Sequence, residues 1–280
     1  MAMTYPEWAN LCLTDVRKWF DETYADFESM IPALYNIGTS DRQEEYDVTY
    51  TGLGKFELLQ GTASQDTMTE EYKTTYTFPE FMKEIQVQRR LWDDRRDRSV
   101  MNLARGLALS ARRTKEAHAA ELFNYAFSAT DTFSGGQSTA HADGKALCAS
   151  DHPSKADGDY RGNNLGSSPI SVTSVGETRD AMRRFTDGRG NKIYAKMDTI
   201  LGPADKDFEE TAWEIINTMG KVDVADNNAN FYKGRFNLLI WDELTDNKNW
   251  FGIDSRLRKI EGPVWLDRIP LETYDKYNEN

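Results

Sequence analysis

The sequence has few of the residues on which disulfide scaffolds, metal centres and histidine-dependent enzymes rely. Only two cysteines occur, Cys12 and Cys148, and only three histidines, His118, His141 and His152. Two thiols so far apart in the chain do not make the paired framework of a small secreted domain, so we expect both to be reduced. Few histidines also leave little material for a catalytic triad.

Long hydrophobic runs are missing as well. No apolar stretch approaches the roughly 20 residues that a membrane-spanning helix requires. The first ten residues, MAMTYPEWAN, have neither a basic start nor an apolar core, so they do not resemble a signal peptide. Hydrophobic residues still make up 39% of the 280 residues, which predicts a folded chain. We therefore expect no membrane partner and a chain that is made and kept in the cytoplasm.

An excess of basic residues is also absent. The chain contains 34 Lys and Arg against 46 Asp and Glu, a net charge of −12, whereas proteins that grip nucleic acid phosphates usually carry a basic balance. The charge is unevenly spread: residues 1–48 hold ten acidic and three basic side chains, and residues 83–115 hold four acidic and ten basic. Either these are two separately solvated faces, or the acidic arm lies on the basic segment of the same or a neighbouring subunit.

The segment CASDHPSKADGDYRGNN, from Cys148 onward, contains metal-binding residue types in incomplete patterns. His141, Cys148 and His152 provide one closely spaced pair of possible zinc ligands. A zinc site generally has two such pairs. DGDYRGNN begins like a calcium loop, but Arg161 occupies a ligand position and Ser168 stands where a bidentate glutamate is needed. The pattern favours a structural loop without a metal or cofactor.

Catalytic signatures are missing too. The chain contains no G-x-S-x-G, no P-loop and no G-x-G-x-x-G. We therefore expect no catalytic residue. The alternative is a metal-dependent hydrolase that uses His141, Asp151 and His152, which lie close together in the sequence.

Residues 46–78 predict a long two-stranded hairpin with a polar, glycine-containing tip. Aromatic and β-branched residues alternate in both strands, as is typical of a pleated strand. The alternating positions are Tyr46, Val48 and Tyr50 in the first strand, and Tyr72, Thr74, Tyr76 and Phe78 in the second. Because an isolated two-stranded hairpin is only marginally stable in water, we expect its aromatic face to be buried on another surface.

Two long helices are predicted. The first covers residues 6–31 and ends at Pro32, and the second covers residues 94–128 after an alternating strand, KEIQVQRRLW, at 83–92. A helix of roughly 35 residues is about 52 Å long, close to the ~50 Å diameter of a compact chain of this size. These features predict a flat, elongated subunit that completes its burial in an assembly.

The rest of the chain predicts a mixed sheet with helices, an α+β fold. The expected features are a glycine-rich irregular segment at 131–170, a capping box at Ser174–Glu177 that opens a short helix, a turn at DGRGN (187–191), a buried strand at 192–201, a helix at 202–220 with Met219 on its apolar stripe, and strands at 236–241 and 249–253.

This order of elements resembles the major capsid proteins of tailed bacteriophages, which have the HK97-type fold, and most of all the Mu-like major head subunit family. The likeness covers roughly residues 40–260. It depends on three segments: RRLWDDRRDRSVMNLARGLALSARRTKEAHAAELFNYAF resembles the passage from a strand into the spine helix, GKALCASDHPSKADGDYRGNNL resembles a loop with His-Pro, Gly and Asn, and KMDTILGPADKDFEETAWEII resembles a strand, proline and helix.

The resemblance implies an HK97-like layout. Its parts would be an N-terminal arm (1–45), an extended loop or E-loop (46–79), a peripheral domain (80–199) with the spine helix (94–128) and the Gly-rich loop (131–170), an axial domain (200–250), and a return to the peripheral domain (251–280). Because the arm is short, either a separate scaffolding protein exists or this arm does part of that work.

The resemblance also implies a structural role. Hexamers and pentamers of this chain would close into an icosahedral shell, the virion capsid, assembled in the host bacterial cytoplasm around double-stranded DNA that is not bound sequence-specifically. A portal and possible scaffolding or decoration proteins would be further partners. Some relatives cross-link a lysine of the extended loop; Lys55 is the only candidate before Lys73, and no other feature here supports that chemistry.

Two groups of residues are expected to serve assembly. The predicted subunit contacts are Tyr46, Tyr50, Lys55, Phe56, Tyr72, Tyr76, Arg89, Arg90, Arg95, Arg96 and Arg98. The predicted loop-shaping residues are His152 and Pro153, which we expect to fix a turn, and Asn163 and Asn164, which we expect near a subunit contact. Arginines alternating with aspartates favour salt bridges between chains over phosphate binding.

Overall fold

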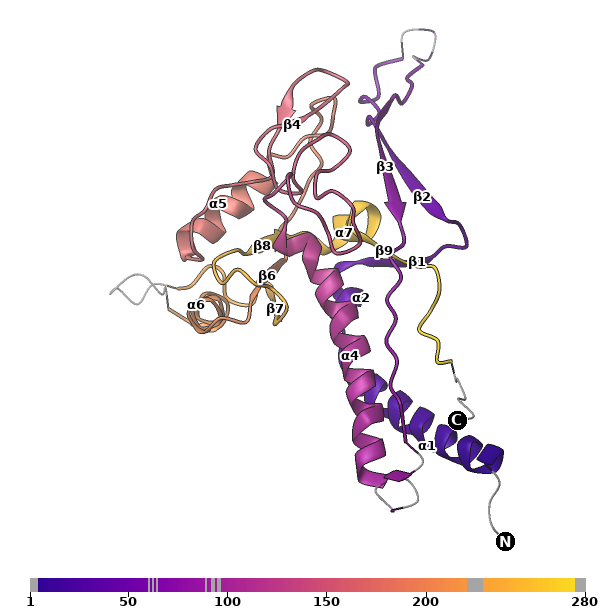
Figure 1. The fold of residues 1–280 in the computed structure, drawn as a ribbon. Helices are drawn as coiled ribbons and strands as arrows, with labels where there is room; N and C mark the ends of the chain where they lie inside the picture. The colour runs from indigo at the N-terminus through magenta and orange to yellow at the C-terminus, as the bar shows by residue number, and fades with distance from the viewer. Residues whose placement is uncertain are drawn as a thin grey trace.

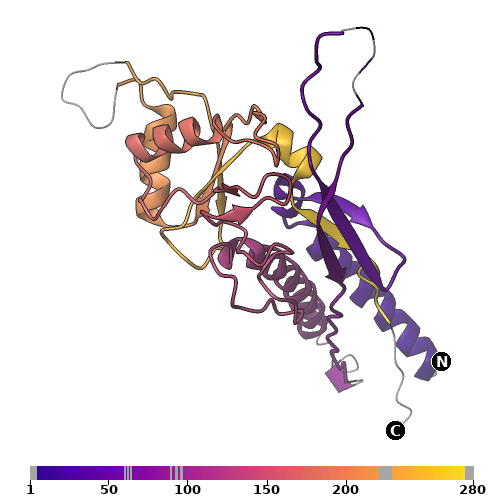
Figure 2. The same ribbon diagram turned by 90° about the horizontal axis from the view of Figure 1, so that it is seen from above.

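The computed structural model describes residues 5–59, 61, 63, 65–88, 90, 91, 94, 97–220 and 229–274. Its elements are α1 (Tyr5–Ala25), α2 (Ile31–Leu34), β1 (Asn36–Thr39), β2 (Glu44–Tyr50), β3 (Glu70–Thr77), α4 (Asp97–Asn124), β4 (His152–Pro153), β5 (Tyr160–Arg161), α5 (Val172–Met182), β6 (Thr199–Pro203), α6 (Lys206–Asn217), β7 (Asn237–Trp241), β8 (Phe251–Ile253), α7 (Ser255–Glu261) and β9 (Val264–Asp267). The subunit is branched: α4 and α1 extend one way, the β2–β3 hairpin another, and the α5–α6 region a third (Figures 1 and 2).

The centre of the branched subunit is a three-stranded sheet in the order β7-β6-β8. Strand β6 pairs parallel with β7 and antiparallel with β8, and all its residues are buried. It begins at Thr199, so only the last three residues of the predicted strand at 192–201 belong to it. Successive side chains of a strand point to opposite faces. Ile200 therefore packs with the core under α5 and α6, and Leu201 packs with the core formed by α2 and the end of α4. One strand thus joins two hydrophobic cores.

Helix α6 lies against this sheet and begins later than the sequence predicts. Pro203 is the last residue of β6, and Asp205 caps the helix by accepting from the backbone N–H groups of Asp207 and Phe208, at 3.1 and 3.4 Å. The helix ends at Asn217, so Met219 is not part of its buried stripe and is 78% exposed.

The N-terminal region forms two helices where the sequence predicts one. Helix α1 ends at Ala25, and Pro32 lies in the first turn of α2, where its missing N–H costs no hydrogen bond. Helix α4 has 28 residues, so it is about 42 Å long and shorter than expected. Helix α1 packs against α4, whose buried side chains there include Ala104 and Ala108 (Figure 1).

The predicted strand at 83–92 is wrong over its described residues. Residues 78–88 are extended, but no strand among the described residues pairs with them, and they run beside α4 (Figure 1). The Nζ of Lys83 lies 2.7 Å from the Oγ of Ser110, and Ile85 and Val87 are half-buried between exposed neighbours. The alternation in the sequence is therefore real, but it reflects an extended chain on a helix and not a sheet.

Two further corrections concern helix α5 and a long-range strand pair. The capping box uses Ser171 as N-cap with Ser174 as its partner, three residues before the predicted position. Strand β1 pairs parallel with β9, from Asn36↔Val264 to Thr39↔Asp267, a pairing that no local sequence pattern predicts. Among the helices in the described part of the chain, none has the length and apolar character needed to cross a bilayer.

Candidate assembly surfaces

The predicted hairpin is present as β2 and β3, but its aromatic side chains do not share one face. Antiparallel residues that lie opposite each other point to the same side of the ribbon. Tyr46 is opposite Thr75 and stacks under the Nζ of Lys73 at 4.1 Å, whereas Tyr76 is opposite Glu45. Tyr46 and Tyr76 therefore point to opposite faces, and the expectation of a single aromatic face is wrong.

The two hairpin faces differ in how much this chain covers them. On one face, Tyr72 and Tyr76 are half-buried, and the Nζ of Lys155 lies 4.2 Å from the ring centre of Tyr72. Burial raises the pKa of Tyr76, with a smaller effect from Asp47. On the other face, Tyr46 is 58% exposed. The face that carries Tyr46 is thus the one that is open to another surface.

One side of the hairpin tip carries exposed apolar side chains, next to the polar, glycine-containing stretch that the sequence predicts. Phe56, Leu58 and Leu59 are all well exposed, next to the exposed Lys55. Beyond the body of the molecule, the hairpin extends as a narrow projection (Figure 2). Exposed apolar side chains that are contiguous in this way are typical of an interaction surface.

The base of this tip is fixed to a turn far away in the sequence. Arg189 Nη1 donates to both carboxylate oxygens of Asp66, at 2.7 and 2.8 Å, and its Nη2 donates to the carbonyl of Thr67 at 2.6 Å. Asp66 also accepts from the N–H of Gly54 at 2.6 Å, which joins the two sides of the tip. The hydrogen bond from Arg189 is the main reason why the pKa of Asp66 lies below its ordinary value.

The glycine-rich loop also contacts the hairpin, at strand β3. Ser154 Oγ lies 3.1 Å from Glu71 Oε1 in β3 and 3.1 Å from the carbonyl of Gly188, and Lys155 donates to the carbonyl of Glu71. Arg161 Nε donates to the carbonyl of Asp187 at 2.9 Å. The loop therefore connects the hairpin to the predicted turn at 187–191, which is present in the structure, and the three parts restrain one another.

His152 and Pro153 do not fix a turn: they form strand β4, paired with Arg161 and Tyr160 of β5. The Nδ1 of His152 lies 2.6 Å from a carboxylate oxygen of Asp143, and its Nε2 lies 3.3 Å from Asn163 Oδ1. Both groups that face the ring are hydrogen-bond acceptors. Asp143 presents a carboxylate oxygen, and Asn163 presents its Oδ1 because its Nδ2 donates to the carbonyl of Leu147 at 2.8 Å. Both ring nitrogens of His152 are therefore engaged by side chains of the same loop.

Asp143 and the asparagines complete the loop. Burial opposes ionisation of Asp143, but the hydrogen bonds from His152 and from the N–H of Lys145 lower its pKa overall. Asn163 Oδ1 accepts from the N–H of Ala149 at 2.9 Å, and Asn164 Oδ1 accepts from that of Gly166 at 2.9 Å. Polar side chains here serve the backbone and one another.

The structure gives no support to the metal-dependent hydrolase. Asp151 pairs with Lys145 and His152 pairs with Asp143, so two of the three side chains proposed as ligands have other partners. In the part of the chain that the structure describes, no cluster of three or more His, Cys, Asp or Glu side chains could hold a metal ion. Burial raises the pKa of Cys148 to about 11, so its thiol is protonated near neutral pH and is a poor nucleophile.

The predicted basic contact segment is only partly described. Arg89, Arg95 and Arg96 lie outside the described residues. Arg90 is exposed, with its Nε 3.7 Å from Asp94 of the same segment, and Arg98 is exposed at the start of α4.

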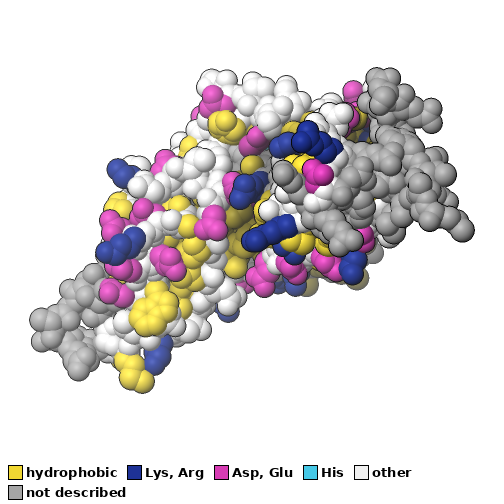
Figure 3. Space-filling view, turned by 60° about the horizontal axis from the view of Figure 1, so that its bottom comes forward, with side chains coloured by type: hydrophobic (Ala, Val, Ile, Leu, Met, Phe, Trp, Pro, Cys, Tyr) yellow, Lys and Arg dark blue, Asp and Glu magenta, His cyan; other side chains and the backbone are white. Residues whose placement is uncertain are grey.

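Basic, acidic and apolar side chains are interspersed on the face that Figure 3 shows, with apolar side chains gathered in a band near its middle.

The N-terminal arm is held to α4 by a carboxylate. Glu116 accepts from Ser29 Oγ at 2.5 Å and from the N–H of Met30 at 3.3 Å, and Arg112 donates to the carbonyl of Phe27 at 2.9 Å. The ring of Tyr24 lies 5.4 Å from the Arg112 guanidinium. The arm thus meets the basic segment of the same chain at this point, through a backbone carbonyl and a tyrosine ring that contact Arg112.

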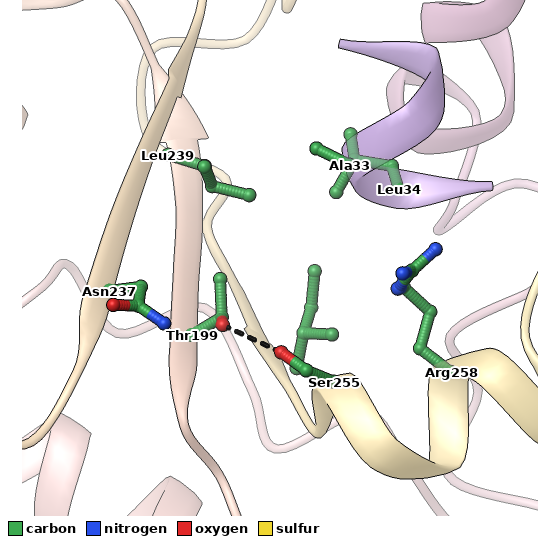
Figure 4. A pocket seen from close by; sticks show the side chains of 8 residues that line it. Ala33, Leu34, Thr199, Asn237, Leu239, Ser255 and Arg258 are labelled. Carbon is green, nitrogen blue, oxygen red and sulfur yellow. Dashed lines mark hydrogen bonds between the residues drawn. The ribbon is translucent and has the colours of Figure 1, made fainter.

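A cavity of about 220 Å³ lies where α2 meets the sheet and α7 (Figure 4). Thr199 and Ser255 contact each other there at 3.1 Å, and the guanidinium of Arg258 donates to the carbonyl of Tyr35 at 3.2 Å. The charged group and the two hydroxyls in the wall therefore have partners inside the chain. The cavity lies at the contact between α2 of the arm, the central sheet and α7.

The likeness of this chain to known proteins is found among solved structures. No protein-family model matches the chain, and no curated protein matches it. Solved chains from bacteriophage JBD30 do: one from its capsid has a TM-score of 0.60 at 12% identity, covering 81% of this chain and 94% of that one. One from its procapsid has a TM-score of 0.56 at 13% identity, covering 86% and 100%. A third, from the capsid decorated with minor capsid protein trimers, has a TM-score of 0.50 at 13% identity, covering 78% and 92%.

The chain therefore has the mixed α and β fold of these phage capsid chains. At 12–13% identity, the likeness is one of fold.

Proposed function

We propose that this chain is the major capsid protein of a tailed bacteriophage and that it assembles with copies of itself into a closed shell. The observation that carries the proposal is the braced hairpin, which holds an exposed apolar tip away from the body of a chain with the fold of the JBD30 capsid chains. A role in structure and not in catalysis agrees with the side-chain pairing of the Asp143–His152 loop.

The proposed layout is HK97-like, of the Mu-like kind. The arm is residues 1–45, the E-loop 46–79, the peripheral domain 80–199 with α4 as spine helix, and the axial domain 200–250, with a return to the peripheral domain at 251–280. The short, separate α2 and the α4 carboxylate at Glu116 support an arm that is attached to the spine helix.

The mechanism that we propose is repeated self-association through the hairpin. Its Tyr46 face and its tip would be buried on a neighbouring subunit, since the opposite face is already covered by the loop around Lys155. Burying an exposed aromatic or leucine side chain contributes roughly 1.5–3 kcal/mol each. The exposed arginines of the basic segment, Arg90 and Arg98 among those described, would pair with carboxylates of the neighbour.

The remaining partners follow from this role. The shell would enclose double-stranded DNA without sequence-specific contacts, as befits a chain with a net charge of −12. Hexamers and pentamers, a portal, and scaffolding or decoration proteins belong to the same proposal, as does assembly in the host cytoplasm.

The experiment is size-exclusion chromatography with light scattering on the purified chain over a range of concentrations. We expect hexamers, pentamers or much larger particles in equilibrium with subunits. A chain that stays monomeric at every concentration and binds a stoichiometric metal would contradict the proposal.

A further inference from the structure

The solvent side of helix α4 carries an unusual row of arginines. From Arg98 to Lys115, the helix contains five basic side chains and no acidic one. Two of the five have partners in the same chain: Arg112 donates to the Phe27 carbonyl, and Lys115 lies 3.2 Å from a carboxylate oxygen of Asp267. These two contacts fasten the N-terminal arm and the strand β9 to the helix.

The other three behave differently. Arg98, Arg105 and Arg113 are exposed, and none of them has an ion pair, hydrogen bond or ring contact within the part of the chain that the structure describes. At 3.6 residues per turn, their positions fall within an arc of about 80° and extend over about 22 Å of the helix. We call the surface formed by Arg98, Arg105 and Arg113 the arginine face.

The arginine face is open and shallow. Asn102, Gly106 and Leu109 lie between or beside the arginines on the same arc. A Cβ atom built on Gly106 would meet no other atom within 4 Å, so no described residue of this chain covers the helix there. Another chain can therefore approach the helix backbone closely at Gly106, with arginines on either side and the half-buried Leu109 available for apolar contact.

We infer that the arginine face of α4 is a docking surface for a carboxylate-bearing surface of a second copy of this chain. Each copy has twelve more acidic than basic side chains, so a second copy supplies the complementary charge in excess. An arginine guanidinium can donate two parallel hydrogen bonds to one carboxylate, which fixes the orientation of the docked copy as well as adding affinity.

Charge density makes duplex DNA the weaker candidate for this face. Over about 22 Å, a duplex presents about 13 phosphate charges, against which three arginines neutralise only a small share. The rest of the subunit, with its net charge of −12, repels a polyanion. An apolar residue and a glycine between the arginines suit a protein contact better than a phosphate track.

The inference rests on the proposed function only in requiring that copies of the chain meet. The test places the photo-crosslinker p-benzoylphenylalanine at Asn102, on the arginine face, and analyses the irradiated full-length protein by gel and mass spectrometry. We expect covalent dimers in which the crosslinker at position 102 is joined to an acidic segment of the second copy. Arg105→Glu with Arg113→Glu should reduce that cross-link roughly tenfold, because like charges then oppose each other.

Two control variants make the result specific. Arg184→Glu changes the charge equally at an exposed arginine outside α4 and should leave the cross-link unchanged. Arg105→Lys with Arg113→Lys keeps the charge and should retain a substantial part of the cross-link. Circular dichroism and the urea midpoint should be the same for all variants, since the three arginines are exposed and make no hydrogen bond, ion pair or ring contact within the described chain.

Other outcomes overturn the inference and are distinguishable from failure of the proposed function. Shells that form normally from the Arg105→Glu, Arg113→Glu variant, with an unchanged cross-link, refute the arginine face alone. A protein that forms neither shells nor any cross-linked oligomer refutes the proposed function too. Binding of a 30-base-pair duplex, measured by anisotropy, that the double variant loses while its oligomers persist would assign the face to nucleic acid instead.

Discussion

Arg189 and Asp66 are 123 residues apart in the sequence, yet one guanidinium nitrogen lies 2.7 and 2.8 Å from the two carboxylate oxygens. Together with the hydrogen bond from Arg189 to the Thr67 carbonyl, this pair ties the tip of the hairpin to the turn at 187–191. The direction in which the hairpin leaves the body is therefore set by the subunit itself, before any neighbour is present.

The first prediction concerns this anchor. Arg189→Ala should leave the global free energy of unfolding within about 1 kcal/mol of wild type, because both side chains are partly exposed to solvent. Amide hydrogen exchange in residues 53–69 should nevertheless become faster, since the tip loses its tie. Arg184→Ala is the matched control, and equal exchange in both variants would show that the anchor does not restrain the tip.

The second prediction concerns the tip. Replacing Phe56, Leu58 and Leu59 by serine should leave the monomer folded with an unchanged urea midpoint, because all three side chains are exposed. The same variant should fail to assemble, since each lost apolar contact costs roughly 1.5–3 kcal/mol at an interface. Particles of normal size, seen by light scattering, would remove the tip from the assembly mechanism. A deletion of residues 56–64, which retains Gly54, Asp66 and the Arg189 anchor, should behave in the same way.

The third prediction contrasts two glycines. A Cβ atom on Gly202 would lie 2.1 Å from the ring of Phe208, so Gly202→Ala should destabilise the fold by roughly 1–3 kcal/mol through overpacking. Gly106 lies within α4 with open space around it, so Gly106→Ala should stabilise the fold by roughly 0.5–1 kcal/mol. Urea denaturation measures both, and changes of the same sign would contradict the packing at β6 or at α4.

The fourth prediction concerns pH. Burial lowers the pKa of His141 below 6.5; Asp143 opposes this shift and the neighbouring His152 adds to it. The unfolded chain then binds a proton at His141 more readily than the folded chain does. The contribution of neutral His141 to the free energy of unfolding is therefore fully present above about pH 6.5, and it falls as the pH drops toward the pKa of the folded state. Urea midpoints between pH 5 and 8 should therefore fall less steeply toward acid in His141→Gln than in wild type. A steeper fall in the variant would mean that the sign is wrong.

Local patterns explain what could be predicted from the sequence. The hairpin, the α6 helix and strands β7 and β8 follow from alternation, capping and apolar periodicity, all of which are local properties of the chain. The aromatic faces could not be predicted, because they depend on which residues lie opposite each other. The register places Tyr46 opposite Thr75 and shifts between Val48 and Tyr50.

Other features depend on partners distant in the sequence. The alternation at Ile85 and Val87 is genuine, but it arises from an extended segment beside α4, with which no described strand pairs. The parallel pairing of β1 with β9 joins residues more than 200 positions apart. Arg105 and Arg113 were not among the predicted contact residues, although their helical spacing from Arg98 was a usable signal.

The central claim is that this chain assembles with itself into closed shells, and imaging tests it most directly. Negative-stain electron microscopy of the purified, concentrated wild-type protein should show hexameric or pentameric rings, sheets or closed particles of uniform curvature, and the serine variant of Phe56, Leu58 and Leu59 should show none. A field of dispersed single subunits in the wild-type sample, under conditions where the chain is folded and concentrated, would contradict the account.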